Sequence, residues 1–195
     1  MRIVAGSAGG RRLVSPKDNR IRPTADKVKE AVFSIIGPNI YDSIVLDLFA
    51  GTGSLGLEAL SRGAEFVTFV EKSPNSLRIL KENIKLTGFV NRSEVLYTDA
   101  LKALEGFERA DRVFDLIFID PPYRDNFYEK TLFSIEKCGI IRNGGLVIVE
   151  HPDSVKLDRG FCRLVPVKNK IYGSTAISIF TRGDDHEDGS ISGKF

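Results

Sequence analysis

Short apolar runs alternate with longer amphipathic segments along the chain from residue 44 onward. The apolar runs cover residues 44–49, 66–71, 94–98, 114–120 and 146–151, and several are apolar on both faces. Strands that helices cover on both sides have this composition, whereas strands with one wet face alternate between apolar and polar residues. The pattern therefore predicts βαβ units that build a parallel sheet.

The segments between the first three runs predict helices. Residues 54–62 form the first helical pattern, and Gly63 ends it. In the second, Ser73 is a capping residue, a proline follows in the first turn, leucine and isoleucine side chains share one face, and Gly88 ends the helix. These helices are expected to cover the sheet.

Both ends of the chain depart from this alternation. Residues 161–173 and 174–182 leave no room for a crossover helix, so they are expected to pair as an antiparallel hairpin. Residues 2–16 predict two short strands around a glycine-rich turn, and the apolar stripe of residues 24–37 predicts an amphipathic helix. The sequence thus predicts an α/β fold with a C-terminal hairpin and a small N-terminal hairpin and helix.

Composition divides the chain into three parts. At 195 residues with 42% apolar content, the chain can bury one substantial core. We expect a basic N-terminal extension over residues 1–40, the α/β domain over 41–182, and an acidic disordered tail over 183–195. No apolar run approaches the roughly 20 residues of a spanning helix, so a cytoplasmic location is the default expectation.

Charge and cysteine content limit the chemistry. Two cysteines and two histidines have no ligand spacing, so no metal site is expected. The first thirty residues hold eight basic residues against three acidic ones, although the net charge of the chain is only +2. Such an end is either a solvated surface or a contact for an anionic partner, because clustered Lys and Arg displace counterions from phosphates.

A glycine loop follows the first predicted strand. Gly51, Gly53 and Gly56 have the GxGxxG spacing, which lets the backbone turn tightly and approach a ligand. Glu71 ends the next strand, where a carboxylate can bind the hydroxyls of a ribose. This pattern alone fits an NAD enzyme, but the acid Asp47 in the first strand, the C-terminal hairpin and the absence of any hydride-transfer residue argue against one.

Further acids lie at the ends of later strands. Asp99 ends the third, and Asp120 opens the word "DPPY" at residues 120–123 after the fourth. Each has an alternative structural role, since Asp99 can cap the helix that follows and a proline pair can simply end a strand. Because carboxyl ends of parallel strands meet at one edge, where open α/β sheets bind ligands, these acids are expected to share one site.

This set of motifs resembles the class I S-adenosylmethionine-dependent methyltransferases, with an acidic "DxFxGxG" loop, two further acids and a [DN]PP[YF] motif. The resemblance implies a Rossmann-like seven-strand methyltransferase sheet that ends in an antiparallel hairpin, and S-adenosylmethionine as cofactor. It implies the following cofactor-binding residues: Asp47, Phe49, Ala50, Gly51, Thr52, Gly53, Glu71, Lys72, Asp99 and Ala100.

In methyltransferases that carry [DN]PP[YF], the target is an exocyclic amine or an amide nitrogen. The resemblance implies that the Asp120 carboxylate and the Pro121 carbonyl each accept one N–H of that nitrogen, so that its lone pair points at the methyl group. Pro122 would complete the rigid turn, and Tyr123 would stack on the base. Catalysis would then come mainly from alignment, which supplies about 7–11 kcal/mol in well-oriented reactions.

Nearly the whole chain, residues 1–182, resembles bacterial 16S ribosomal RNA (guanine-966-N2)-methyltransferases of the RsmD type, through "RIVAGSAGGRRL", "RPTADKVKEAVFSII", "DPPY" and "YGST". This resemblance implies a monomer acting on the N2 amine of a guanine in 16S ribosomal RNA, within an assembling or assembled small subunit. The implied RNA-binding residues are Arg2, Arg11, Arg12, Arg20, Arg22 and Thr24.

Two other functions fit parts of the pattern. Methylation of adenine N6 in DNA uses the same DPPY chemistry, although the chain has no room for a separate target-recognition domain. A non-catalytic RNA-binding protein on the same fold is the other alternative, and the intact Asp120 and glycine loop argue against it.

Overall fold

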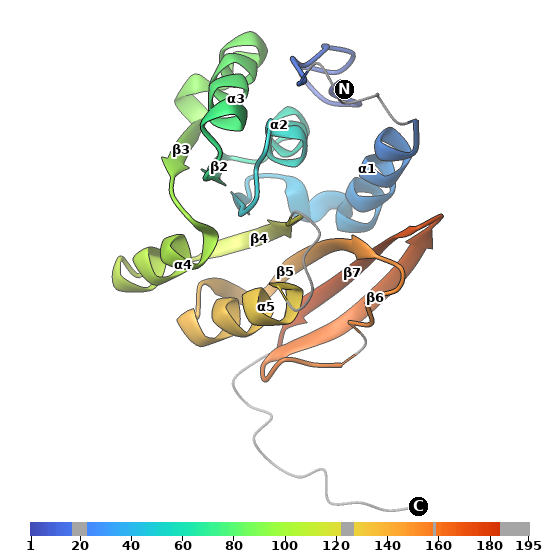
Figure 1. Cartoon of the computed structure of the whole chain (residues 1–195), viewed down its shortest axis with the longest axis vertical. Coiled ribbons are helices and arrows are strands. Elements are labelled where there is room, and N and C mark those ends of the chain that lie inside the picture. The colour runs from blue at the N-terminus through green and yellow to red at the C-terminus, as the bar shows by residue number, and fades with distance from the viewer. Residues whose placement is uncertain (17–22, 122–126, 158, 184–195) are drawn as a thin grey trace, which may run out of the picture.

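The computed structural model describes residues 1–16, 23–121, 127–157 and 159–183. Its centre is a seven-stranded sheet in the order β3-β2-β1-β4-β5-β7-β6, in which β7 runs antiparallel to both of its neighbours (Figure 1). The predicted parallel sheet with a C-terminal antiparallel hairpin is confirmed. The strands are β1 Ile44–Asp47, β2 Phe66–Glu71, β3 Ser93–Tyr97, β4 Phe114–Ile119, β5 Ile141–Pro152, β6 Leu164–Tyr172 and β7 Thr175–Arg182.

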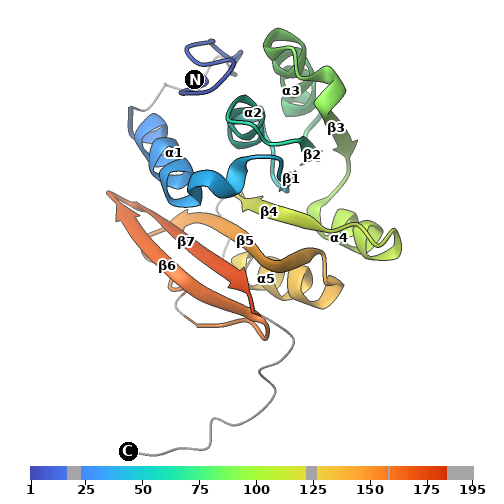
Figure 2. The same ribbon diagram turned by 180° about the vertical axis from the view of Figure 1, so that it is seen from behind.

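Helices cover both faces of the sheet. One face carries α1 Pro23–Ile36, α2 Ser54–Ser61 and α3 Pro74–Thr87, and the other carries α4 Ala100–Arg109 and α5 Phe127–Cys138 (Figures 1 and 2). Two short 3-10 turns span Gly37–Ile40 and Val90–Arg92. Among the described residues, no helix is long and apolar enough to cross a bilayer.

The predicted capping of α3 is present. The Ser73 hydroxyl accepts a hydrogen bond from the backbone N–H of Ser76 at 3.4 Å, and Gly88 adopts a left-handed φ of 79° at the other end. These two residues satisfy backbone groups that would otherwise lack a partner at the helix termini. The helix therefore begins and ends where its sequence indicates.

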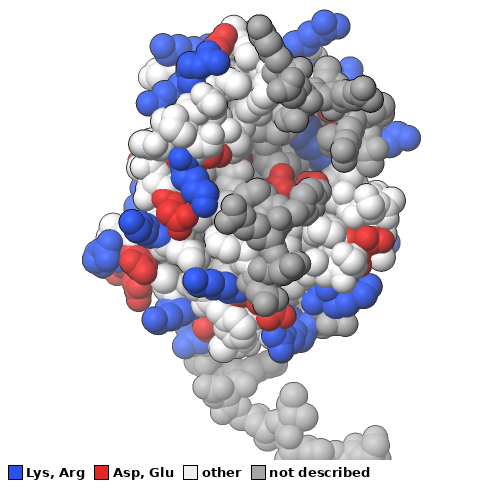
Figure 3. Space-filling model, in the orientation of Figure 1, with Lys and Arg blue, Asp and Glu red and all other residues white. Residues whose placement is uncertain are grey.

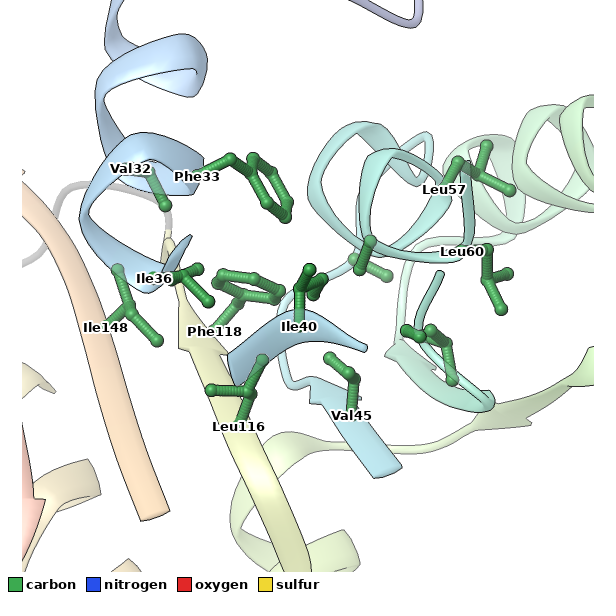
Figure 4. Packing of buried hydrophobic residues seen from close by; sticks show 14 of the residues in the cluster. Val32, Phe33, Ile36, Ile40, Val45, Leu57, Leu60, Leu116, Phe118 and Ile148 are labelled. Atoms are coloured by element: carbon green, nitrogen blue, oxygen red, sulfur yellow. The ribbon is translucent and has the colours of Figure 1, made fainter. Parts of the chain in front are cut away.

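Alternating side chains of the strands fill two cores. On the α1–α3 face, Val45, Phe118 and Ile148 from three adjacent strands pack with α1 and α2, as Figure 4 shows. The Phe118 ring lies 5.7 Å from that of Phe33 on α1, measured between centroids. The residues next to these three along each strand face the other core, as the pleat of a strand requires.

The N-terminal segment forms less strand than the sequence predicts. Its pairing is one antiparallel bridge, between Arg2 and Arg12, beside a few turn hydrogen bonds. Between these residues the chain packs against the end of α2: a Cβ added to Gly6 would lie 1.8 Å from the carbonyl oxygen of Ser61, and Ser7 N–H donates to that oxygen at 2.7 Å. Close contact with α2 thus replaces a longer hairpin.

A buried acid on α2 fixes this segment to the domain. Glu58 is fully buried and accepts the backbone N–H groups of Val4 at 2.7 Å and Ala5 at 3.0 Å. Its carboxylate also pairs with Lys29 of α1 at 3.3 Å and with Arg62 at 2.7 Å. Because a buried carboxylate is stable only with such partners, Glu58 joins the N-terminal segment, α1 and α2 into one body.

Asn83 on α3 makes the second attachment. Its side chain accepts from Val14 N–H at 2.7 Å and donates to the carbonyls of Val14 and Thr52, each at 3.0 Å. Thr52 belongs to the glycine loop, so one amide joins the N-terminal segment to that loop. Chain boundaries at residues 40 and 183 stay predictions, and residues 184–195 lie outside the described part.

Candidate active site

A cavity of about 570 Å³ opens at the carboxyl ends of the central strands. Its walls come from the glycine loop after β1, the ends of β2, β4 and β5, and the segment that joins β3 to α4. Figure 3 shows a hollow on this face of the molecule, with acidic side chains inside it and lysine and arginine side chains around it. The position is the one at which open α/β sheets bind ligands.

The glycine loop has the backbone that a close ligand contact requires. Gly51 and Gly53 adopt left-handed φ angles of 54° and 89°. A Cβ at Gly53 would lie 2.5 Å from Leu80, so this position is closed to larger residues, whereas a Cβ at Gly51 would stand in open space with nothing nearer than 4.0 Å. Since Gly51 lines the cavity, its missing side chain leaves room for a ligand beside the backbone.

Glu71 holds the loop in place. One of its carboxylate oxygens accepts the N–H of Gly51 at 2.7 Å, and the other accepts the N–H of Ser73 at 2.6 Å. The side chain lines the cavity, and each oxygen has a second lone pair that can accept a hydroxyl of a ligand. Glu71 therefore fixes the loop, and its contact with a ribose stays a prediction.

Asp99 is placed differently from the other predicted acids. Its carboxylate caps α4 by accepting Leu101 N–H at 3.0 Å and pairs with Lys72 at 3.3 Å. Thr98, Ala100 and Lys72 line the cavity, but Asp99 does not. The structural alternative, a helix cap, is thus realised, and contact of Asp99 with a cofactor stays a prediction.

Asp47 lies beneath the loop. It is only 3% exposed, and one carboxylate oxygen accepts Gly56 N–H at 3.0 Å. Burial raises the pKa of Asp47 to about 7, because the charged form loses hydration that one backbone donor does not replace. The nearby Glu71 adds to the increase, so Asp47 couples the loop to the acids around it.

The DPPY motif opens directly onto the cavity. Asp120 follows β4, which ends one residue earlier than predicted, and both Asp120 and Pro121 line the cavity. Asp120 is exposed toward this space, yet protein surrounds it closely. Removal from bulk water, followed by the charges of Glu150 and Asp47, raises the pKa of Asp120 well above its usual range. Pro122 and Tyr123 lie outside the described residues.

Glu150 is an acid of this site that the sequence analysis missed. It lies at the end of β5 and lines the cavity with Asp120, and burial raises the pKa of its carboxyl. The sequence signal was an acid after the apolar run of residues 146–149, as Asp120 follows residues 114–119. Met1 and Pro16, from the N-terminal segment, also reach the cavity.

Most of the other predicted cofactor-binding residues line this cavity. They are Phe49, Ala50, Thr52 and Ala100. Gly53 belongs to the loop but does not line the cavity, and a Cβ added to it would meet the side chain of Leu80. Among the residues that the structure describes, no group of three His, Cys, Asp or Glu is placed to hold a metal ion.

The basic residues Arg2, Arg11 and Arg12 are not among the residues that line the cavity. Arg2 and Arg12 are exposed, and Arg2 pairs with Asp26 at 3.2 Å. Arg11 is also exposed and donates to the carbonyl of Leu86. Arg20 and Arg22 fall outside the described residues, and Thr24 is described only as part of the backbone of α1.

Known proteins match nearly the whole of this chain. A family model described as "Conserved hypothetical protein 95" matches residues 1–181. The protein named "Ribosomal RNA small subunit methyltransferase D" from Escherichia coli K12 is 35% identical over 182 residues, which cover 93% of this chain and 90% of that protein. This chain belongs to the ribosomal RNA small subunit methyltransferase D family. The family predicted from the motifs is confirmed.

Solved structures agree with the fold of the family. That of yhhF from E. coli matches with a TM-score of 0.82 at 28% identity, covering 94% of this chain and 98% of that one. A Thermus thermophilus 16S rRNA N2 G1207 methyltransferase, solved with AdoMet and guanosine, matches with a TM-score of 0.66 at 21% identity, over 85% of this chain and 44% of that one. The second likeness shows a shared Rossmann-like methyltransferase fold.

Proposed function

We propose that this protein transfers a methyl group from S-adenosylmethionine to the exocyclic N2 amine of a guanine in the 16S ribosomal RNA of the small subunit. One observation carries the proposal: Asp120 and Pro121 line the same cavity as the glycine loop and Glu71. A methyl donor held by the loop would thus lie beside an amine held by the DPPY motif. Family membership supplies the class of RNA.

Residues of the loop side would hold the cofactor. Gly51 allows close approach of a ligand to the backbone, and Glu71 offers free lone pairs for the two ribose hydroxyls. Phe49, Ala50 and Thr52 would complete this wall. When bound, S-adenosylmethionine supplies a methyl group carried on a positively charged sulfur.

Residues of the DPPY side would orient the amine. Its lone pair is delocalised into the base, which makes the nitrogen a poor nucleophile. The Asp120 carboxylate and the Pro121 carbonyl can each accept one N–H, favour a pyramidal nitrogen and leave its lone pair free. The proton that the nitrogen releases after methylation can pass to the ionised Asp120 carboxylate, which its raised pKa makes a stronger proton acceptor than a solvated carboxylate.

The surroundings of the RNA are also part of the proposal. Exposed Arg11 and Arg12 can contact phosphates beside the site, and a paired guanine must leave its stack to enter the cavity, at a cost of a few kcal/mol. The assembling or assembled small subunit in the cytoplasm, with the protein acting as a monomer, is the context in which we expect the reaction.

The test is labelled methyl transfer to unmethylated small subunits, naked ribosomal RNA and DNA, followed by mass spectrometry of the nucleosides. N2-methylguanosine from small subunits or their RNA is the expected product. N6-methyladenine in the DNA sample would replace the proposal with the DNA alternative. No transfer to any polymer, together with retained RNA binding, would favour the non-catalytic alternative.

A further inference from the structure

Three acids continue one face of the sheet toward the cavity, and two of them, Asp120 and Glu150, line it. Residues two apart on a strand point to the same side, so Asp47, Asp120 and Glu150 follow Val45, Phe118 and Ile148, the residues that pack under α1 and α2 in Figure 4. The acids therefore lie on the α1–α3 face, just beyond the end of the apolar core. They come from three adjacent strands, β1, β4 and β5.

Asp120 and Glu150 are neighbours across two of these strands. Ile119 is in register with Val149, so the next residue of each chain segment is the acid. Adjacent strands lie about 4.8 Å apart, and both side chains line the cavity. Within the described part of the chain, neither carboxylate has an ion pair or a hydrogen bond. Two acceptors thus stand side by side at the substrate end of the site.

Such a pair matches one edge of one base. Guanine presents N1–H next to its N2 amine, which gives two adjacent donors on the Watson–Crick edge, whereas adenine and cytosine each present an acceptor beside their amine. Enzymes that act on a flipped base read this edge by hydrogen bonds. An ionised carboxylate only accepts, so two of them favour guanine and oppose the other amine-bearing bases.

We propose that Glu150 is a specificity-determining residue that accepts the N1–H of the target guanine while Asp120 accepts an N–H of the N2 amine. The inference rests on the proposed function, because it assigns the second contact of the same base. A residue that only caps a helix or packs in the core would not change which base is methylated, whereas Glu150 in this role would.

Charge supports the assignment. Burial raises the pKa of Glu150, and burial together with the charges of Glu150 and Asp47 raises that of Asp120, so each carboxyl holds its proton more tightly than a solvated one would. Lys72 is a cation among the described residues that line the cavity, and it pairs with Asp99. A positively charged sulfur and two N–H donors would favour the ionised acids, the form in which Glu150 only accepts hydrogen bonds.

The experiment compares guanine with a base that keeps the N2 amine but differs at N1. 2-Aminopurine keeps the N2 amine but has an acceptor at N1, so it lacks the proposed contact. Small-subunit RNAs are built by ligation around a synthetic segment that carries guanine or 2-aminopurine at the target position, and are reconstituted with the small-subunit proteins. The measured quantity is kcat/KM for transfer of labelled methyl to each substrate.

Wild-type protein should prefer guanine strongly. In Glu150→Gln the amide can donate to N1 of 2-aminopurine, so the ratio of guanine to 2-aminopurine rates should fall about tenfold or more, the effect of one mismatched hydrogen bond. Glu150→Ala should lose rate on guanine without gaining on 2-aminopurine. Glu82→Gln makes the same chemical change on the exposed face of α3 and should leave the ratio at its wild-type value.

The outcomes separate the two proposals. If wild-type protein transfers no methyl to the guanine substrate, the proposed function fails. If it does, and Glu150→Gln binds S-adenosylmethionine normally but keeps the wild-type ratio, the role of Glu150 is overturned while the function stands. Comparing one ratio between variants cancels any effect that 2-aminopurine has on RNA structure.

Discussion

Glu71 and Asp120 line one cavity from strands on either side of β1, and their carboxylates have opposite surroundings. Glu71 accepts two backbone N–H groups, at 2.7 and 2.6 Å. Asp120 accepts no hydrogen bond from any described residue, and its neighbours Asp47 and Glu150 are acids that raise its pKa. The carboxylate of Glu71 therefore has hydrogen-bond donors within the described protein, and that of Asp120 has none.

This difference indicates what each side of the cavity does. A carboxylate that accepts backbone donors stabilises a loop, so the β2 side is preformed for a ligand that fits a fixed shape. Acids placed together without donors destabilise the empty site and gain stability from a ligand that brings N–H groups or positive charge. Under the proposed function, binding of the cofactor and selection of the substrate would therefore fall to different strands.

Asp120→Ala tests this division most strongly. Methyl transfer should fall by a factor on the order of 10²–10⁴, because the variant loses both the orienting acceptor and the proton acceptor, while S-adenosylmethionine should bind as before. Labelled transfer gives the rate, and calorimetry gives the affinity for the cofactor. Wild-type turnover in this variant would remove Asp120 from the reaction.

Glu71→Ala should show the reverse behaviour. The backbone N–H groups of Gly51 and Ser73 lose their acceptor and the ribose loses its contact, so affinity for S-adenosylmethionine should fall about 10- to 100-fold. Glu71→Gln keeps one acceptor oxygen and should lose less. If calorimetry gives the same dissociation constant for all three proteins, the β2 side is not the cofactor side.

The regular part of this arrangement could be predicted from the sequence. Apolar runs and helix caps gave the order of strands and helices, and the rule that parallel strands end at one edge placed Glu71 and Asp120 in the same site. The C-terminal hairpin followed from the lack of room for a helix between residues 161 and 182. Each of these inferences uses a pattern of residues that are near one another in the sequence.

The features that could not be predicted from the sequence depend on contacts between segments that are far apart in the chain. Glu150 joins the site because β5 pairs with β4 in one register, and no local pattern states that pairing. Glu58 and Asn83 resemble surface residues of helices, yet each holds the N-terminal segment through backbone hydrogen bonds. Asp99 suits both a helix cap and a ligand contact, so its position alone could not decide between them.

Asp47 sharpens the comparison because it belongs to both kinds of acid. It accepts Gly56 N–H, yet its pKa is raised from 3.8 to about 7. The folded state therefore binds more protons than the unfolded state between these values, and the stability that Asp47 contributes is lost as the pH rises through this window.

Asp47→Asn keeps an oxygen for Gly56 and carries no charge at any pH. Without cofactor, the variant should match the wild-type protein near pH 4 and exceed its free energy of unfolding by on the order of 4 kcal/mol at pH 8. Urea unfolding at both pH values measures this. Equal stabilities at pH 8 would show that Asp47 is ionised without penalty, which contradicts the raised pKa.

The smallest expected effect extends the comparison to the outer surface. If acids at the bottom of the cavity select the base, affinity for the phosphate backbone must come from cations elsewhere. Replacing Arg11 and Arg12 with alanine should weaken RNA binding several-fold and reduce the slope of log affinity against log salt by about 1.4–1.8, the contribution of two phosphate contacts. Arg12 should contribute at least as much as Arg11, whose guanidinium already donates to the Leu86 carbonyl.

Titration of a labelled small-subunit RNA at several salt concentrations gives the slope. The matched control replaces Lys168 and Lys170, two exposed cations of the edge strand β6. If the control pair lowers the slope as much as the arginine pair does, the RNA follows β6. An unchanged slope in the arginine variant would remove the N-terminus from the interface and leave affinity to the cavity and the residues around it.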